Sequence, residues 1–337
     1  MLEKEKIKLD YGSGGLLTDS LIKELFLKIF NNKYLSDLDD SAIFKIGKNI
    51  FAFTTDSYVV NPIFFPGGDI GKLAVCGTIN DLVVMGAKPL FLSCGLIIEE
   101  GLEMDTLKKI VQSMQKVAKE NDVQIITGDT KVVNKGTADK IFINTSGIGI
   151  MEESYVPDKN KIKPDDEIII SGYIGDHGIA VLIQREGFKF NTNIKSDCSS
   201  CYSLIRDVMR VSKNIKFMRD PTRGGLATVL CEICERSGYS AIIKEQEIPI
   251  RKGVKGICEI LGFDPLYIAN EGKVVFVVDK KDSKNILNTL RKNKIGKAAK
   301  IIGKILNEKK GKLYLETQIG GTRIIEKLYG DQLPRIC

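Results

Sequence analysis

Apolar residues recur along the first half of the chain with two spacings, one typical of helices and one typical of strands. Residues 104–121 place their apolar side chains on one side of a helix, and residues 69–85 are apolar nearly all round until Gly86. Short runs of β-branched and aromatic residues lie before, between and after these two segments, and a Gly-Lys-Asn hairpin signal at 47–49 separates the first two runs. The pattern predicts strands over 41–46, 50–55, 90–98, 123–127 and 141–150, with helices over 16–30, 69–85 and 104–121.

The composition changes at residues 152–166, where two prolines and many charges replace the apolar runs. We interpret this segment as a linker between domains. The second block has predicted strands over 167–171, 241–244, 273–278, 300–305 and 312–316 and helices over 177–185, 199–211, 224–236 and 281–292. We predict an α/β (α+β) protein with domains over 1–155 and 156–325. Because Pro334 excludes a helix, residues 326–337 are predicted to form a mobile tail that buries little surface.

The overall composition is that of a globular protein and narrows the function classes. The chain has 337 residues, 43% hydrophobic and 28% charged, which excludes a disordered or collagen-like protein. The 50 Lys and Arg residues outnumber the 43 Asp and Glu, but they are spread along the chain, so we expect no nucleic-acid partner. No apolar run approaches the roughly 18 residues that cross a bilayer, and the charged start carries no secretion signal. We therefore expect no membrane association and a cytoplasmic location.

Two cysteine pairs have the spacing of zinc ligands: Cys198 with Cys201, and Cys231 with Cys234. The second pair lies inside the predicted helix over 224–236, where cysteines three residues apart usually pack into a core. Neither pair lies in the Gly-rich turn that zinc knuckles prefer. Buried thiols are the favoured interpretation and a four-cysteine zinc site is the alternative. Disulfides are not expected in a reducing compartment.

A glycine-rich segment at 11–15, Tyr-Gly-Ser-Gly-Gly, opens the predicted helix over 16–30. The N–H groups of Gly12, Gly14 and Gly15 could hold phosphate there, because the N-terminus of a helix attracts anions. The segment lacks the Gly-Lys-Ser/Thr of a Walker A loop. An ordinary flexible turn is therefore the alternative interpretation.

Four acidic residues of the first domain lie at strand ends or inside a helix. Asp40 precedes a strand, and Asp81 interrupts an apolar helix. Asp56 and Asp129 follow strands. Carboxylates at strand ends converge on one rim of a sheet, and their hard oxygen atoms suit Mg²⁺ bound together with phosphates. A single such Asp is usually a cap or turn residue, but four of them beside a glycine loop favour a phosphate site, in which Lys131 could neutralise a transferred phosphate.

The second domain adds a cationic turn and an isolated carboxylate. The stretch Arg-Asp-Pro-Thr-Arg at 219–223 runs into Gly-Gly at a predicted helix start, which makes Arg223 part of a second candidate anion site. Glu271 lies in an Asn-Glu-Gly turn just before a strand. His177 is the only histidine, so a His-based metal cluster is excluded, and a cap or packing role is favoured over a catalytic one.

A series of motifs runs along nearly the whole chain: GSGG, DDSAIF, TTDSYVVNPIFFPGGDIGKLAVCGTINDLVVMGAKPLFL, GDTKVV, RDPTRGGLATVL, NEGK and the terminal PRIC. Together, and in this order, they resemble the HypE family of hydrogenase maturation proteins. The NDL-x-x-MGA block resembles a wider superfamily of ATP enzymes that includes aminoimidazole ribonucleotide synthetase, selenophosphate synthetase and thiamine-phosphate kinase. The terminal Pro-Arg-Ile-Cys narrows the resemblance to HypE, whereas the two cysteine pairs are not part of the pattern.

The resemblance implies a fold, an activity and partners. The implied fold is PurM-like, with two α/β domains and an N-terminal domain that pairs with a second copy into a barrel-like homodimer core. A carbamoyltransferase, HypF, would load a carbamoyl group onto the C-terminal cysteine. ATP with Mg²⁺ would then drive dehydration of the thiocarboxamide to a thiocyanate. The cyano group would pass to iron on a HypC–HypD scaffold, as a ligand for the iron of [NiFe]-hydrogenase.

The expected residue roles combine this implied chemistry with the motifs. Cys337 is the expected carrier, because a thiol at the end of a mobile tail can visit two sites, and Arg335 is expected to lower the pKa of the thiol. Glu271 is the expected base and Lys131 the expected electrostatic group. The expected nucleotide positions are Gly12, Gly14, Gly15, Asp40, Asp56, Lys72, Asn80, Asp81, Asp129 and Arg223, with Asp40, Asp56, Asp81 and Asp129 as metal ligands.

Three alternatives stay open at this point. A selenophosphate synthetase would carry a reactive cysteine or selenocysteine and a lysine in its glycine-rich segment, where this chain reads YGSGGLL. A phosphotransferase of the thiamine-phosphate kinase type would have no use for a terminal cysteine. An interaction scaffold would use the cysteine pairs, with zinc and without ATP.

Overall fold

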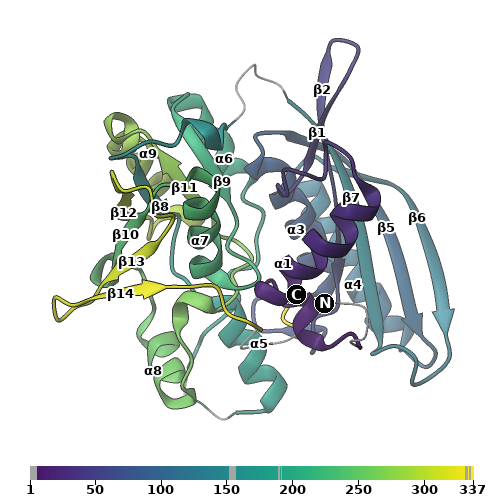
Figure 1. Ribbon diagram of the computed structural model, residues 1–337. Helices are drawn as coiled ribbons and strands as arrows, with labels where there is room; N and C mark the ends of the chain where they lie inside the picture. Colours follow the sequence, from purple (N-terminus) through teal and green to yellow (C-terminus); the bar gives the residue numbers. More distant parts are fainter. Residues whose placement is uncertain (1–5, 152–156, 189, 191, 331–332, 334) are drawn as a thin grey trace.

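The chain folds into two mixed α/β domains, each built on its own sheet (Figure 1). The structure is a computed structural model that describes residues 6–151, 157–188, 190, 192–330, 333 and 335–337. None of the helices within these ranges is both long enough and apolar enough to cross a membrane.

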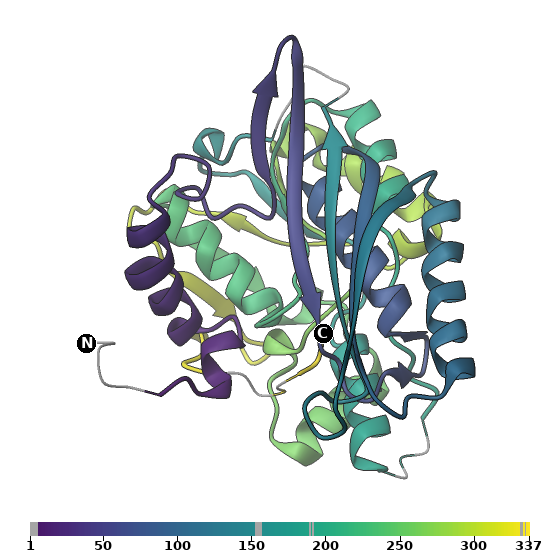
Figure 2. The same cartoon turned by 90° about the vertical axis from the view of Figure 1, so that its right-hand side faces the viewer.

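The N-terminal domain is a five-stranded sheet with two long helices on one side of it (Figure 2). The strand order is β1-β2-β7-β5-β6, in which β5 and β6 are parallel and all other neighbours are antiparallel. Its elements are α1 (Leu16–Leu21), a π-helical turn (Ile22–Phe26), α2 (Leu27–Phe30), β1 (Ala42–Ile46), β2 (Asn49–Tyr58), β3 (Phe64–Phe65), β4 (Gly68–Asp69), α3 (Ile70–Val84), β5 (Lys88–Glu99), α4 (Met104–Glu120), β6 (Gln124–Val133) and β7 (Ile141–Ile150).

Helix α3 is the central element of the molecule and packs against β2, β7, α4 and, in the second domain, α6 (Tyr202–Val211). The Asp69 side chain caps its N-terminus by accepting the N–H groups of Gly71 and Lys72. A helix that is apolar all round must be covered on all sides, and nearly every residue of α3 is buried. A Cβ at Gly77 would lie 2.2 Å from the Tyr58 hydroxyl, so glycine permits the close approach of α3 to β2.

The C-terminal domain is a seven-stranded sheet, in the order β14-β13-β10-β12-β8-β11-β9. All neighbours are antiparallel except β10 and β13. Besides α6, its elements are β8 (Glu167–Ile170), α5 (Asp176–Glu186), β9 (Ile215–Arg219), α7 (Gly225–Ser237), β10 (Ala241–Lys244), α8 (Lys252–Leu261), β11 (Val275–Val278), α9 (Lys280–Lys292), β12 (Lys300–Ile305), β13 (Leu313–Glu316) and β14 (Thr322–Ile325).

The central strands of this second sheet are buried on both faces. In β11, Phe276 and Val278 belong to the apolar cluster that includes α6 and α9, whereas Val275 and Val277 belong to the cluster that includes α7. A strand covered on both sides reads as a continuous apolar run rather than an alternation. This explains why the run at 274–278 carries no polar residue.

The predicted helices and strands are confirmed as elements, and the main differences are omitted elements and strand lengths. The sequence interpretation missed β9, α8, β14 and the two-residue strands β3 and β4. It also ended β6 six residues too early, at 127 instead of 133, and β2 three residues too early. Helix α8 contains Gly253 and Gly256, which lower helix propensity, and it forms because Val254, Ile257 and Cys258 are buried on one side. The predicted linker at 152–166 lies between β7 and β8, with residues 152–156 outside the described residues.

Candidate active site

Four carboxyl groups converge where α3, β2 and the end of β9 meet. Asp56 points from β2 toward α3, because it shares the inward face of that strand with buried Thr54 and Tyr58. The Thr54 hydroxyl lies 2.9 Å from Asp81 Oδ2 on α3 and 2.8 Å from the carbonyl oxygen of Asp40. Asp220, at the end of β9, completes the group and is 5% exposed. Two domains therefore supply one acidic cluster.

The electrostatics of this cluster favour bound protons or a bound cation. Burial raises the pKa of Asp81 well above its ordinary value, and the neighbouring Asp220, Asp56 and Asp40 raise it further. Burial, with Asp40 and Asp56 nearby, raises the pKa of Asp220 to about 7. The pKa values of Asp40 and Asp56 are also raised, chiefly by burial. Carboxyl groups held this close repel one another when ionised, so a cation that enters would replace their protons.

The acids do not form a complete metal site by themselves. Within the described ranges, no group of three or more His, Cys, Asp or Glu side chains is arranged to hold a metal ion. Asp40 is held 2.8 Å from the Arg219 guanidinium, which also pairs with Glu232. Phosphate oxygens would have to supply further ligands, as they usually do for Mg²⁺.

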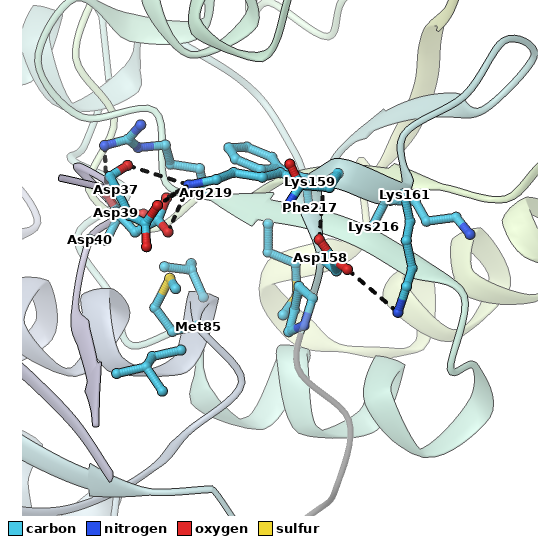
Figure 3. Close-up of a pocket in the computed structure, with 15 residues that line it drawn as sticks. Asp37, Asp39, Asp40, Met85, Asp158, Lys159, Lys161, Lys216, Phe217 and Arg219 are labelled. Carbon is cyan, nitrogen blue, oxygen red and sulfur yellow. Dashed lines mark hydrogen bonds and ion pairs between the residues drawn. The ribbon is translucent and has the colours of Figure 1, made fainter. Parts of the chain in front are cut away.

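A cavity of about 460 Å³ opens beside Asp40, between the two domains. Figure 3 shows Arg219 and Lys159 pointing toward the acidic segment at 37–40. The Lys159 Nζ atom lies 2.9 Å from Asp39 Oδ1. The cationic side chains at the acidic end of this cavity are thus paired with protein carboxylates, and they tie the segment before β1 to the second domain.

Glu271 lies on the second-domain side of the cluster and is 2% exposed. Burial raises its pKa well above the ordinary value, and the nearby Asp220 and Asp56 add to the shift. Its Oε1 atom is buried without a hydrogen-bond partner. Its backbone N–H donates to Asp197 Oδ1 at 3.1 Å, which fixes the turn. A buried carboxyl group near other acids, with one oxygen atom that has no hydrogen-bond partner, is suited to proton exchange with a ligand.

Arg223 connects the acidic cluster to the end of the chain. Negative charge at Cys337 raises the pKa of Arg223, and Asp56, Glu271 and Asp81 contribute in the same direction. The same guanidinium donates to the carbonyl oxygen of Gly12 at 3.1 Å. Arg223 is therefore the cation toward which the terminal residue, the predicted base and two predicted metal ligands converge.

The glycine loop is packed tightly, and part of its hydrogen-bonding capacity is already used. The Gly14 N–H donates to Thr18 Oγ1 at 2.9 Å, and the Leu16 N–H donates to the Leu328 carbonyl at 2.9 Å. A Cβ at Gly15 would lie 2.5 Å from that same carbonyl oxygen. Gly12 lines a cavity of about 170 Å³ together with Arg223 and Cys337. The loop thus borders the terminal cysteine, and a phosphate would have to displace the present partners of Gly14 and Leu16.

The C-terminal segment differs from the expectation that it buries little surface. Leu333 is 5% exposed and Ile336 is 2% exposed. The Val59 N–H donates to a terminal oxygen of Cys337 at 3.0 Å, and the Asn61 N–H donates to the Arg335 carbonyl at 3.4 Å. The expectation was wrong because the apolar side chains at 333 and 336 are buried in the larger apolar cluster, which no local pattern reveals. Mobility of this tail stays a prediction.

The expected effect of Arg335 on the Cys337 thiol stays a prediction. Its guanidinium pairs with Asp139 at 3.0 Å and donates to the Val59 carbonyl at 3.2 Å. Arg335 and Arg223, which comes from the second domain, line the same cavity as Cys337, and negative charge at Cys337 raises the pKa of Arg223.

Asp129 and Lys131 do not join the other acids within one chain. In the register of β5 with β6, Asp129 is paired with Gly95 and Lys131 with Ile97. Ile97 is 44% exposed and lies on the face of the sheet that α3 leaves open. Asp129 and Lys131 pair with each other at 2.8 Å with 68% of each side chain exposed. Because Asp56 points to the opposite face, these residues could meet such a cluster only in a second copy.

Two further predicted positions have structural partners in this conformation. The Lys72 Nζ atom donates to the Gly67 carbonyl at 2.9 Å. The Asn80 amide nitrogen donates to the Ser199 carbonyl at 3.2 Å, and Asn80 Oδ1 accepts the Cys201 N–H at 2.8 Å. Asn80 therefore joins α3 to the second domain beside Glu271, and it supports the site by holding the two domains in place.

The interpretation of the cysteine pairs as buried thiols is confirmed. Cys198 and Cys201 are buried in one apolar cluster, and Cys231 and Cys234 are buried in the other. Burial raises the pKa of Cys231 and of Cys234 to about 12. Two pairs in different clusters cannot combine into one four-cysteine site.

Comparisons with known proteins match both domains of the chain to one family. Residues 38–151 match the family "AIR synthase related protein, N-terminal domain", and residues 163–316 match "AIR synthase related protein, C-terminal domain". The chain is 42% identical to the carbamoyl dehydratase HypE of Cupriavidus necator, over 100% of this chain and 96% of the relative. The chain belongs to the HypE family.

Solved structures of HypE proteins have the same architecture. A HypE in a crystal structure of a HypE–HypF complex superposes with a TM-score of 0.87 at 47% identity, over 92% of this chain and 100% of that one. A HypE crystallised in complex with ATP superposes with a TM-score of 0.82 at 45% identity, over 98% and 100%. The predicted two-domain, PurM-like architecture is thereby confirmed. The match over the whole chain favours a HypE protein over the selenophosphate synthetase, phosphotransferase and scaffold alternatives.

Asp220 is the functional candidate that the sequence interpretation left out of its site. It was noted only as part of the cationic turn at 219–223, where it reads as a local partner of the arginines. Asp220 directly follows β9, just as Asp56 directly follows the predicted strand over 50–55. Because β9 was not predicted, the position of Asp220 at a strand end could not be recognised.

Proposed function

We propose that this HypE protein catalyses the ATP-dependent dehydration of a carbamoyl group carried on Cys337, from thiocarboxamide to thiocyanate. The observation that carries the proposal is that Arg223 lines one cavity with the terminal cysteine and lies close enough to Asp56, Asp81 and Glu271 for their charges to raise its pKa. The thiocyanate would supply the cyanide ligand for the iron of [NiFe]-hydrogenase. Carbamoyl dehydratases of the same family, one of them crystallised in complex with ATP, support this assignment.

The reaction needs a leaving group on the amide oxygen and a base for the amide protons. Attack of that oxygen on the γ-phosphorus of ATP forms an iminophosphate and releases ADP. Loss of the remaining N–H proton then expels phosphate and forms the C≡N bond, so that thiocarboxamide and ATP become thiocyanate, ADP and phosphate. Arg223 offsets the negative charge beside Cys337, and Glu271 accepts the proton.

The acidic cluster fits a magnesium ion that arrives with the nucleotide. Carboxylates of the cluster, among Asp56, Asp81 and Asp220, would supply part of its ligands and phosphate oxygens the rest, because neighbouring ionised carboxylates need a counter-charge. The ion would neutralise phosphate charge and orient the γ-phosphate. Asp40 stands next to this group, but its carboxylate is already paired with Arg219.

We also propose that the protein acts as a homodimer through the open face of the five-stranded sheet. Phe53 on β2 and Phe91 and Ile97 on β5, the two strands that flank β7, are 45%, 38% and 44% exposed on this face. Asp129 and Lys131 lie on the same face. A second copy that covered it would bury the apolar side chains and form the barrel-like core. It would also bring Asp129 and Lys131 toward the partner.

HypF is the proposed carbamoyl donor, since a relative with 47% identity is found in a complex with HypF. A HypC–HypD iron scaffold is the proposed acceptor of the cyano group. Both roles require the end of the chain to leave the cavity beside Arg223, because the thiol must reach a group held by another protein.

The proposal is tested by the intact mass of the chain after incubation with HypF, carbamoyl phosphate and ATP. We expect the gain of one carbamoyl group, followed by the loss of one water. Cys337→Ala keeps the terminal carboxylate and is expected to gain no carbamoyl group. Carbamoylation of that variant, or a wild-type chain that never loses water in the presence of Mg²⁺ and ATP, would contradict the proposal.

A further inference from the structure

The docked end of the chain is held from two sides. On one side, residues 59–61 pair with the backbone of Arg335 and Cys337. The intervening residue, Ile336, presents its carbonyl oxygen to the other side, where the Nε2 atom of His177 lies 2.8 Å away. This contact comes directly before the cysteine in the chain.

His177 is built into the second domain so that its ring has little freedom. It lies in the first turn of α5 and is 0% exposed. The Phe65 ring meets it edge-on, with ring centroids 5.4 Å apart and planes at 89°. Its Nδ1 atom lies 2.8 Å from Ser196 Oγ. A buried ring with both nitrogen atoms engaged is oriented by its surroundings rather than by the tail alone.

For a neutral ring, the hydrogen bonds allow one arrangement of protons. A carbonyl oxygen only accepts, so Nε2 carries the hydrogen and donates it to Ile336. Nδ1 is then an acceptor and takes the Ser196 hydroxyl hydrogen. Ser196 Oγ in turn accepts the Cys198 N–H at 3.0 Å. Burial lowers the pKa of His177, which agrees with a neutral ring, although Asp197 acts in the opposite direction.

We infer that His177 is a positioning residue that holds the C-terminal tail, through Ile336, so that the Cys337 thiol stays at the cavity beside Arg223. Ser196 fixes the required tautomer. We call the hydrogen bond from His177 to Ile336 the latch. Its role in dehydration rests on the proposed function, but the latch itself forms in the protein without nucleotide. The role of His177 is to retain the tail, not to take part in the chemistry on the sulfur.

The latch is connected to the predicted base through one short loop. Ser196 holds His177, and the next residue, Asp197, accepts the Glu271 N–H and pairs with Lys273 at 3.1 Å. A Cβ at Gly272 would lie 2.0 Å from the Asp197 carbonyl oxygen, so this loop and the Glu271 turn are in close contact. Tail retention and base placement therefore depend on the same segment.

The His177 bond is one of several contacts that hold the tail, which also include the Arg335–Asp139 ion pair, the bonds to residues 59 and 61 and the buried Ile336 side chain. One buried hydrogen bond contributes enough to shift a two-state equilibrium by about three- to tenfold. Loss of the His177 bond should therefore expose Cys337 more often without unfolding the chain.

The test uses the full-length apo protein and measures the rate at which iodoacetamide alkylates Cys337, read from the C-terminal peptide by mass spectrometry. His177→Phe keeps a ring and removes both hydrogen bonds. We expect it to raise the rate about three- to tenfold. His177→Gln keeps a donor near the position of Nε2 and should restore a rate close to the wild type. Ser196→Ala leaves the ring in place and should raise the rate in the same direction, but less.

Ile286→Val is the matched control for general loss of stability. Ile286 is 0% exposed in α9, which packs on α6, β8 and β12 rather than on the tail. Its alkylation rate should equal that of the wild type. An unchanged rate in both His177→Phe and Ser196→Ala, or an equal increase in Ile286→Val, would overturn the inference.

A second measurement separates retention from chemistry. With HypF present, carbamoylation of Cys337 in His177→Phe should proceed at least as fast as in the wild type. The following dehydration at saturating ATP should be slower by about three- to tenfold, with rescue by His177→Gln. If both steps slow equally, the positioning role is wrong. If the wild type accepts no carbamoyl group, the proposed function fails, while the alkylation rates still decide whether the latch exists.

Discussion

The two sheets of this protein bury their strands in opposite ways. In β11 of the second sheet every residue is buried, because α6 and α9 cover one face and α7 the other. In β6, the edge strand of the first sheet, nine of the ten residues are exposed. The second domain thus completes its own core, whereas the first domain presents a face and an edge that a partner could cover.

The acidic residues follow the same division. Glu271, next to β11, is buried, and burial raises its pKa. Asp129, on β6, is exposed, and its hydrogen bond with Lys131 lowers its pKa. Burial thus shifts the pKa of a carboxyl group inside the second domain toward values useful for proton transfer. A carboxyl group on the exposed sheet keeps its charge and can contact a second copy of the chain.

The largest expected effect tests the packing difference itself. Val277 is 0% exposed in β11, and Val277→Asp would place an unpaired carboxylate between two apolar clusters. We expect a loss of more than about 4 kcal/mol in the free energy of unfolding. Val132→Asp, at a position 67% exposed in β6, should change it by about 0.5 kcal/mol or less. Urea unfolding at one protein concentration measures both, and equal losses would contradict the comparison.

The next effect concerns the buried carboxyl group beside β11. Glu271→Gln keeps size and hydrogen bonding but cannot accept a proton. The variant should still take up carbamoyl on Cys337, yet form thiocyanate about 10²- to 10⁴-fold more slowly. Mass spectrometry of the C-terminal peptide follows both products. Exposed Glu100→Gln is the control, and thiocyanate at the wild-type rate in Glu271→Gln would show that Glu271 is not the base.

A smaller effect appears in the pH dependence of stability. The pKa of Asp220 is about 7 in the folded chain and about 3.9 when unfolded. As pH rises between these values the unfolded state loses its proton first, so wild-type stability falls across this window. Asp220→Asn lacks this loss. From pH 4 to pH 8 its free energy of unfolding should therefore rise relative to that of the wild type by on the order of 1–3 kcal/mol. Urea unfolding at several pH values checks this, with exposed Asp129→Asn as the control that shows no such gain.

The smallest expected effect tests whether the open sheet is an interface. Phe91→Glu puts a charge on the exposed face of β5 and should weaken self-association about tenfold or more. Ile319→Glu, at a position 96% exposed in the turn between β13 and β14, should leave self-association unchanged. Sedimentation equilibrium measures both variants. A wild-type chain that is monomeric at all concentrations would contradict the dimer.

Regular periodicity made most of the fold predictable. The limits of α3 and α4 follow from the repeat of apolar positions and from their ends, and the structure places them within one residue of the prediction. Short elements with weak patterns were lost: α8 is interrupted by two glycines, and β9 is five residues long. Their stability comes from burial against neighbours, which a local pattern does not contain.

The candidate site was predictable in its residue types but not in its grouping. Asp56, Asp81 and Glu271 were named from their positions at strand ends and inside an apolar helix, and the structure brings them together. Asp129 was named by the same reasoning, yet the pleat of the sheet turns it to the opposite face. Asp220 was overlooked because its strand was not recognised.

Taken alone, the sequence determined that this is a two-domain α/β protein of the HypE type that ends in a cysteine, because helix periods, strand runs and ordered motifs are local properties of a chain. The tertiary structure alone decided that the tail is docked against residues 59–61, that Arg223 of the second domain lies beside Cys337, and that His177 lies within hydrogen-bond distance of Ile336. These facts depend on contacts between residues more than a hundred positions apart. Such contacts are set by how the two domains pack, and no local pattern encodes them.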